Sequence, residues 1–222
     1  MAGLFNYDYK LMTALGKMCD CMVLSILWCI CSLPIVTVGA STTALYYAVN
    51  KSVRYNRGYA YKEFFRAFKS NFKQSTIVWL INLAFLLFGA YDCYILYQLQ
   101  DAISGAKIIA VVIVVLMDFL SIWMIYVYPY MARFALSTKA LMKNCLIIAL
   151  INFWWSLLLL VLFAVVIIAF VFLPPIALFL PVIYMVIANR ILEKVFRKYM
   201  SDEDIEAEEE RNRVEYNKMA IE

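Results

Sequence analysis

The chain of 222 residues contains several long stretches without a single charged side chain. Two of them, residues 108–117 and 157–173, consist entirely of aliphatic, aromatic and sulfur-containing residues. Uncharged apolar runs near 20 residues are typical of transmembrane helices. Because several such runs cannot all be buried in one small globule, the sequence predicts an all-α, polytopic transmembrane bundle. The composition agrees, with 65% hydrophobic and 16% charged residues, against about 45–50% and about 25% in soluble domains.

Five apolar segments are evident, at about 21–38, 76–96, 108–130, 146–173 and 176–192. The distribution of basic residues orients them, because cytoplasmic loops are enriched in Lys and Arg. Residues 51–73 carry seven Lys or Arg and one acid, so this loop is predicted to be cytoplasmic. Alternating spans then place the basic stretches 133–143 and 190–198 on the same side. The C-terminus is therefore predicted to lie in the cytoplasm and the protein in the cell membrane.

The stretch CSLPIVTVGASTTALYY, residues 31–47, decides between five and six segments. A single span here would place Lys10 and Lys17 outside. A turn at Pro34 to Gly39, followed by a returning helix that starts at Ser41 or Thr42, would keep them inside. The positive-inside rule favours the hairpin, which gives about six membrane segments with both termini cytoplasmic. Five segments are the alternative.

Residues 59–74, YAYKEFFRAFKSNFKQ, combine phenylalanines at helical spacing with basic side chains. This pattern predicts an amphipathic helix lying at the membrane interface. It would either rest on anionic lipid headgroups or dock a cytoplasmic partner. Its predicted contact residues are Lys62, Phe64, Phe65, Arg66, Phe68, Lys69, Phe72 and Lys73.

The chain divides by composition into a transmembrane helical domain, residues 1–199, and an acidic C-terminal tail, residues 200–222. Ser201 followed by acids in the next turn is a favourable helix start. The tail is predicted to be either a soluble cytoplasmic helix or disordered.

Asp118 is the one acid near the middle of an apolar segment. An ionised Asp at that depth costs about 2.5–3.5 kcal/mol on translocon scales, so it is predicted to face the bundle interior or water. It would contact an ion, a proton or a sugar, or it would form an interhelical hydrogen bond to Asn82, Asn152 or Ser121. Asp118, Asn82 and Asn152 are the candidates for an intramembrane polar site.

The residues offer little for catalysis. Histidine is absent, the six cysteines show no metal-binding spacing, and no phosphate-cradling or nucleophile motif occurs. We expect no enzyme, no cofactor and no metal site. The basic loop lies too close to apolar helices to indicate nucleic-acid binding, and the lipid bilayer is the expected surrounding.

Two stretches carry a family resemblance. LWCICSLPIVTVGASTTALYYAVNKSVRYNRGYAYKEFFRAFKSNFKQSTIVWLI (27–81) and YPYMARFALSTKALMKNCLIIAL (128–150) resemble the YesL family of bacterial integral membrane proteins, a family of unknown function. Its members are often encoded beside carbohydrate ABC importers. The resemblance therefore implies a link to carbohydrate transport, with importer permeases as partners. It implies no catalytic residues.

Three functions follow as hypotheses. The first is an accessory or regulatory membrane component that acts with a carbohydrate ABC importer; the chain has no ATP-binding motif of its own. The second is a small secondary transporter with Asp118 on its path. The third is a structural or assembly protein of the membrane.

Overall fold

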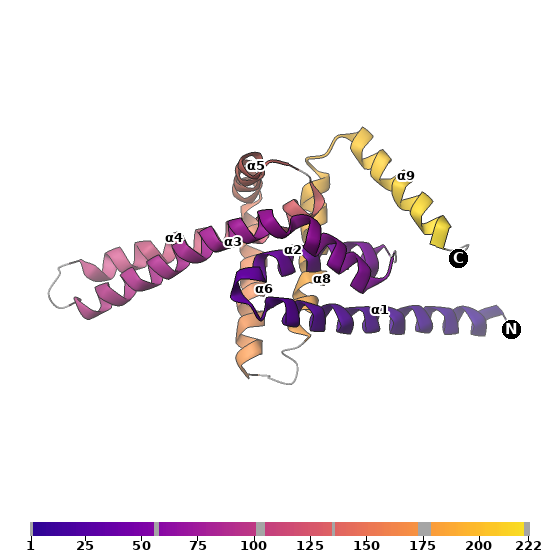
Figure 1. The fold of residues 1–222 in the computed structure, drawn as a ribbon, viewed down its shortest axis with the longest axis horizontal. Helices are drawn as coiled ribbons and strands as arrows, with labels where there is room; N and C mark the ends of the chain where they lie inside the picture. Colours follow the sequence, from indigo (N-terminus) through magenta and orange to yellow (C-terminus); the bar gives the residue numbers. More distant parts are fainter. Residues whose placement is uncertain (1, 56–57, 101–104, 135, 173–178, 220–222) are drawn as a thin grey trace.

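The computed structural model describes residues 2–55, 58–100, 105–134, 136–172 and 179–219, and every regular element in these ranges is helical (Figure 1). The elements are α1 (Ala2–Ser32), the 3₁₀ turn η1 (Ile35–Thr37), α2 (Val38–Ala48), the π-helix η2 (Val49–Arg54), α3 (Ala60–Gln98), α4 (Ala106–Arg133), α5 (Thr138–Ile151), α6 (Phe153–Phe172), α8 (Leu180–Arg197) and α9 (Asp202–Met219). The predicted all-α fold is confirmed.

The turn predicted between residues 34 and 39 is present, and α1 and α2 form an antiparallel hairpin. Trp28 Nε1 donates to Thr42 Oγ1 at 3.3 Å, and Ser52 Oγ donates to Asp20 Oδ2 at 3.0 Å. The predicted start of the returning helix was wrong. The helix begins at Val38, because Pro34 opens a 3₁₀ turn that leads directly into it. Ser41 is therefore buried inside α2 instead of capping it.

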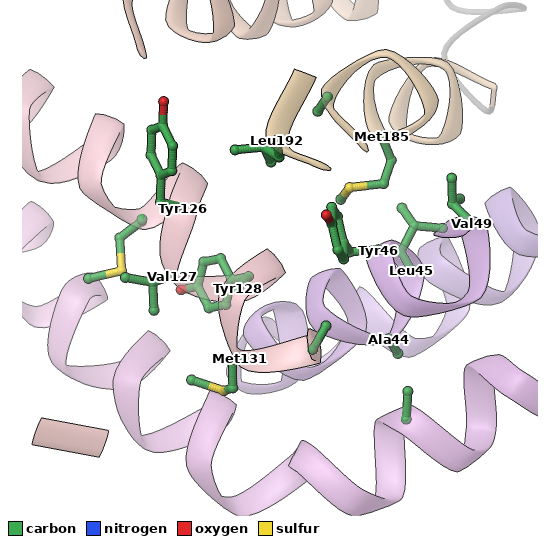
Figure 2. Packing of buried hydrophobic residues seen from close by; sticks show 14 of the residues in the cluster. Ala44, Leu45, Tyr46, Val49, Tyr126, Val127, Tyr128, Met131, Met185 and Leu192 are labelled. Carbon is green, nitrogen blue, oxygen red and sulfur yellow. The ribbon is translucent and has the colours of Figure 1, made fainter. Parts of the chain in front are cut away.

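Helix α2 forms the centre of the packed core. Ala40, Ala44 and Ala48 follow one another at four-residue spacing, and each is 0% exposed. Gly39 has a packing role: a Cβ there would lie 2.6 Å from Trp79 Cβ and 2.7 Å from the Ser75 carbonyl oxygen of α3. Small residues at this spacing let helix backbones approach closely in membranes. Figure 2 shows side chains of α2, α4 and α8 meeting in this core, with Tyr46 beside Met185.

The amphipathic segment 59–74 is not a separate interfacial element. Helix α3 starts at Ala60 and continues to Gln98, and no Gly or Pro interrupts it before Gly89. Thirty-nine residues extend about 58 Å at 1.5 Å per residue, roughly twice the thickness of a hydrocarbon core. The basic aromatic segment is therefore a rigid extension of an apolar helix.

The segment predicted as one helix over 146–173 is broken. Helices α5 and α6 meet at Asn152 with a bend of 97° between Thr138–Ile151 and Phe153–Ala169. The side-chain amide of Asn152 donates to the Ile148 carbonyl oxygen at 2.9 Å and to Tyr199 Oη at 2.8 Å. The Ser156 hydroxyl lies 2.9 Å from the Ala149 carbonyl oxygen across the bend. These side chains partner backbone groups that a bend frees.

Within the described residues, three helices are long and apolar enough to cross a membrane: Leu15–Ser32 of α1, α3 and α4. The bent pair α5–α6 makes a fourth if it counts as one span. The six predicted segments are thus not confirmed as six spans. In Figure 1, α3 and α4 form a long hairpin that extends away from the other helices, and α6 and α8 run across its direction.

Candidate functional site

The most polar buried site surrounds Glu193 of α8, whose side chain is fully buried. Tyr46 Oη donates to Glu193 Oε1 at 2.8 Å, and Asn50 Nδ2 lies 3.5 Å from the same oxygen. The other oxygen, Oε2, is paired with Arg133 at the end of α4 and lies 3.5 Å from Arg54 of η2. Both carboxylate oxygens thus have a hydrogen-bond donor and a second polar partner. That number of partners is what a buried charge requires.

Arg133 connects this buried acid to the C-terminal helix. Its side chain is 8% exposed, and its two terminal nitrogens pair with different acids, Glu193 and Glu208 of α9. Met200 Sδ lies 3.2 Å from the nitrogen that pairs with Glu208. The acidic tail is therefore a helix that contacts the end of α4. Ser201 caps it as predicted, because its Oγ accepts the Asp204 N–H at 3.2 Å.

Two further arginines complete the cluster. Arg54 donates to Asn189 Oδ1 at 3.3 Å, and Arg197 donates to Tyr55 Oη at 3.1 Å and to Glu209 Oε1 at 3.2 Å. Partial burial lowers the pKa of Arg197, but Tyr55, Glu208 and Glu209 together raise it by more, so its pKa lies above the usual value. The guanidinium therefore stays charged.

The charges of this cluster balance only when α9 is docked. The cluster consists of Arg54, Arg133, Arg197, Glu193, Glu208 and Glu209. Three positive charges face three negative ones, and two of the negative charges belong to α9. Removal of the helix would leave two uncompensated positive charges in a largely buried place, which is costly. The arrangement holds α9 against the helices that carry the arginines.

The segment that links α2 to this cluster is a π-helix, Val49–Arg54. Single-turn π segments are rare, and they occur frequently at functional sites. Asn50 and Arg54 both lie on it and both approach Glu193. The unusual backbone thus coincides with the polar site.

The basic aromatic residues predicted to contact lipid or a partner divide between two faces of α3. Phe64 is fully buried, and Phe68 packs against the core. Glu63 is 8% exposed, 3.3 Å from Lys51 and 2.6 Å from Arg66. The outward-facing members are Lys62, Phe65, Arg66, Lys69, Phe72 and Lys73. The inner face therefore stabilises the fold, and only the outer face is available for contacts.

The structure does not bring the three candidate polar residues into one site. Asn82 is 4% exposed, and Asn152 is bound to Ile148 and Tyr199 at the bend. Asp118, predicted to face the bundle interior or water, is exposed on the outer part of α4 and does not face the interior. Helix α4 presents that turn to the outside because the core begins only near Met124.

Two cavities are lined almost entirely by apolar side chains. One of about 500 Å³ lies between α1 and α8, and another of about 300 Å³ lies among α1, α2, α6 and α8. Trp28, Phe163 and Tyr184 line the second. Asp118 lines neither of them. In the ranges that the structure describes, no group of three or more Cys, Asp or Glu could hold a metal ion.

Sequence reasoning missed Glu193, although a signal existed. Met185, Asn189 and Glu193 follow at four-residue spacing and are all buried. An acid on the apolar face of a helix, flanked by Arg190 and Lys194 on other faces, indicates a buried ion pair. Residues 190–198 are basic overall, and this net charge conceals their single acid.

These observations define the class: an all-helical protein with three or four candidate membrane spans and a buried ionic cluster at one end of its core. Residues 21–93 match the model of a protein family described as DUF624, of unknown function. The match runs from within α1 through α2 and into α3, so it includes the hairpin turn and η2. No curated protein and no solved structure matches the chain.

Proposed function

We propose that this protein is an accessory or regulatory component of the cell membrane with no enzymatic activity of its own. The observation that carries the proposal is the docking of the acidic helix α9 on Arg133 and Arg197 by ion pairs with Glu208 and Glu209. The Arg197–Glu209 pair is partly exposed and therefore weak, and a partner that offered its own acid to Arg133 would compensate the buried charge that α9 leaves. Helix α9 would leave the cluster when a partner competes for it.

The proposed topology has six membrane segments and both termini in the cytoplasm. The proposed segments are α1, α2 with η2, α3, α4, the bent pair α5–α6, and α8. This topology requires α6 and α8 to turn in the membrane from the crosswise direction that they take in Figure 1 toward that of α3 and α4. Support comes from the cluster itself, because Arg54, Arg133 and Arg197 belong to the three stretches that the charge distribution assigns to one side, and all three meet there. A reporter tag at the N-terminus should therefore be protected in intact cells. Labelling of that tag from outside would contradict the six-segment topology.

The proposed partner is the permease of a carbohydrate ABC importer. The support is the resemblance of residues 27–81 and 128–150 to the YesL family. Purification of the tagged protein in mild detergent should recover permease subunits, and deletion of its gene should change sugar uptake. An unrelated membrane protein with the same tag and expression level is the control. Recovery of the protein alone, together with unchanged uptake, would remove the proposal.

The regulatory part has a separate test. Glu208→Gln combined with Glu209→Gln should release α9, and a protease should then cleave the tail faster. The matched control is Glu203→Gln with Glu210→Gln, two exposed acids of the same helix. Salt at 0.5 M should act on the wild type in the same direction but less strongly, because it screens the partly exposed Arg197–Glu209 pair more than the buried Arg133–Glu208 pair. Equal cleavage of both double variants would exclude this mode of docking.

Transport by the chain alone has less support. Asp118 lies outside both described cavities, so no polar path leads to it from them. Sugar or proton flux in liposomes that contain only this protein would favour transport over the accessory function.

A further inference from the structure

The outer part of the α3–α4 hairpin exposes apolar side chains on both helices. Phe88 of α3 is 66% exposed, and Val111 and Val115 of α4 are 62% and 59% exposed. Figure 1 shows this part of the hairpin extending beyond the other helices. Lipid alone could cover such a surface, because lipid tails are as apolar as these side chains.

Asp118 is the feature that lipid does not satisfy. It lies about 17 Å along α4 from Lys107 and about 23 Å from Arg133 at 1.5 Å per residue, so neither end of the helix brings its carboxyl near the headgroups. It is exposed, and no hydrogen bond or ion pair joins it to any residue that the structure describes. The neighbouring Ser121 hydroxyl donates to the Met117 carbonyl oxygen at 3.0 Å. A carboxyl group at this depth requires a donor from elsewhere.

The hairpin presents this face on a closely packed support. A Cβ at Gly89 would lie 2.8 Å from Met117 Sδ, so α3 and α4 touch directly beneath the exposed residues. Cys93 Sγ lies 4.0 Å from the Ala110 carbonyl oxygen one turn further out. The two helices therefore form a fixed surface on which a third helix could pack without rearrangement of the pair.

A second copy of the chain is a poor donor. The sequence has no Lys, Arg or His between residues 74 and 98 or between residues 108 and 132. A symmetric pairing through this face would bring two Asp118 carboxyls together, and like charges repel. Charge complementarity therefore points to a membrane helix of a different protein.

We propose that the face of α4 formed by Val111, Val114, Val115 and Asp118 binds a transmembrane helix of a partner protein, and that this helix carries a Lys or Arg near the middle of the membrane. The three valines supply the apolar contact, and Asp118 supplies the specificity. The inference rests on the proposed accessory function, since it names the surface and the chemistry through which that function would engage a membrane partner.

The first test uses designed peptides as probes. The full-length protein carries a fluorescence donor and is reconstituted in vesicles of phosphatidylcholine and phosphatidylglycerol (3:1). Acceptor-labelled Leu/Ala spanning peptides carry a central Lys, Leu or Glu. The Lys peptide should associate at least tenfold more tightly than the Leu peptide, and the Glu peptide no better than the Leu peptide. Asp118→Leu should abolish the preference for Lys, whereas the control Asp92→Leu, near the outer end of α3, should keep it.

Several results would overturn the inference. One is equal association of the three peptides with the wild type. Another is an unchanged Lys preference in Asp118→Leu. A third is energy transfer between two labelled copies of the protein that Asp118→Leu removes, because this would make the face a self-association surface. Asp118→Leu removes a carboxyl from an exposed position, so the variant should fold, and circular dichroism checks that it does.

The second test separates this inference from the proposed function. The Asp118→Leu variant is purified beside the wild type from cells in mild detergent. Permease recovered with the wild type and lost with Asp118→Leu supports both proposals. Permease recovered equally with both removes the Asp118 surface and leaves the accessory function standing. No permease with either removes the importer as the partner, and the peptide assay then decides on the surface alone.

Discussion

The two halves of α4 show how differently one helix is used. Val115, in the half near the α3–α4 turn, is 59% exposed, whereas Val127, three turns further on, is fully buried. The uncovered half is the more apolar in sequence, and the covered half carries the tyrosines of α4 and Arg133. The difference in exposure arises because α2, α5, α6 and α8 cover only the half that leads to Arg133. The covered half belongs to the core, and the uncovered half leaves its apolar side chains exposed.

Polar groups follow the same division. In the covered half, Tyr126 Oη lies 3.0 Å from Ser156 Oγ, and Arg133 is paired with Glu193. In the uncovered half, Asp118 has no partner among the described residues. A polar group that the fold satisfies stabilises the fold, and one that it leaves unsatisfied is a candidate for contact with something else. Substitutions in the two regions should therefore affect different measurements.

The largest effect on stability is expected from Glu193→Ala. This change leaves Arg133 and Arg54 without their shared buried acid, and loss of one partner of a buried pair costs about 3–5 kcal/mol. The free energy of unfolding is measured by titration with SDS in mixed micelles. Glu210→Ala, at an exposed position of α9, is the control and should be nearly neutral. A loss below about 1 kcal/mol for Glu193→Ala would mean that the cluster contributes little to stability.

Gly39→Ala comes next. The added methyl would overlap Trp79 Cβ and the Ser75 carbonyl oxygen, so α2 and α3 must separate, at a cost of about 1–3 kcal/mol. Gly16→Ala in α1 is the matched control, because nothing lies within 4 Å of its added Cβ. It should be neutral or slightly stabilising, since Ala favours a helix over Gly. Similar unfolding free energies for the two variants would show that the close approach of α2 and α3 is not required.

Much of this fold follows from the sequence. Long uncharged runs predicted helices, Pro34 predicted a turn, and Ser201 predicted a helix start. Each depends on residues close together in the chain. Among the misplaced features, the break within residues 146–173 depends on distant residues. The bend at Asn152 relies on Tyr199, which lies between α8 and α9, and on Tyr126 of α4. An average of hydropathy along the chain cannot detect such partners.

The candidate site was harder to predict for the same reason. Glu193 looks like one acid in a basic stretch until Arg54 and Arg133 are brought to it from residues far away in the chain. Asp118 stands out in the sequence as the acid within an apolar segment, but its direction depends on which half of α4 the other helices cover. The sequence shows which ionisable side chains are present, but it does not show the direction in which they point.

A smaller effect is expected at the α5–α6 bend. Ser156→Ala removes a hydroxyl that lies within 3.0 Å of Tyr126 Oη and 2.9 Å of the Ala149 carbonyl oxygen. The expected loss is about 0.5–1.5 kcal/mol, the net contribution of a typical hydrogen bond. Ser156→Cys, which keeps a weak donor, should lose less. An unfolding free energy unchanged by Ser156→Ala would show that these contacts do not stabilise the bend.

The smallest effect on stability is expected at Phe88, in the outer part of α3 that the core does not cover. Phe88→Ala removes a ring that is 66% exposed, so the unfolding free energy should change by no more than about 0.5 kcal/mol. The same change at Phe64, which is 0% exposed, should cost about 3–5 kcal/mol, because it opens a cavity in the core. Both residues lie on one continuous helix and differ only in what covers them. If Phe88→Ala in micelles destabilised the protein as much as Phe64→Ala, the outer hairpin would be part of the folding core. Its exposed face would then not be free to bind a partner.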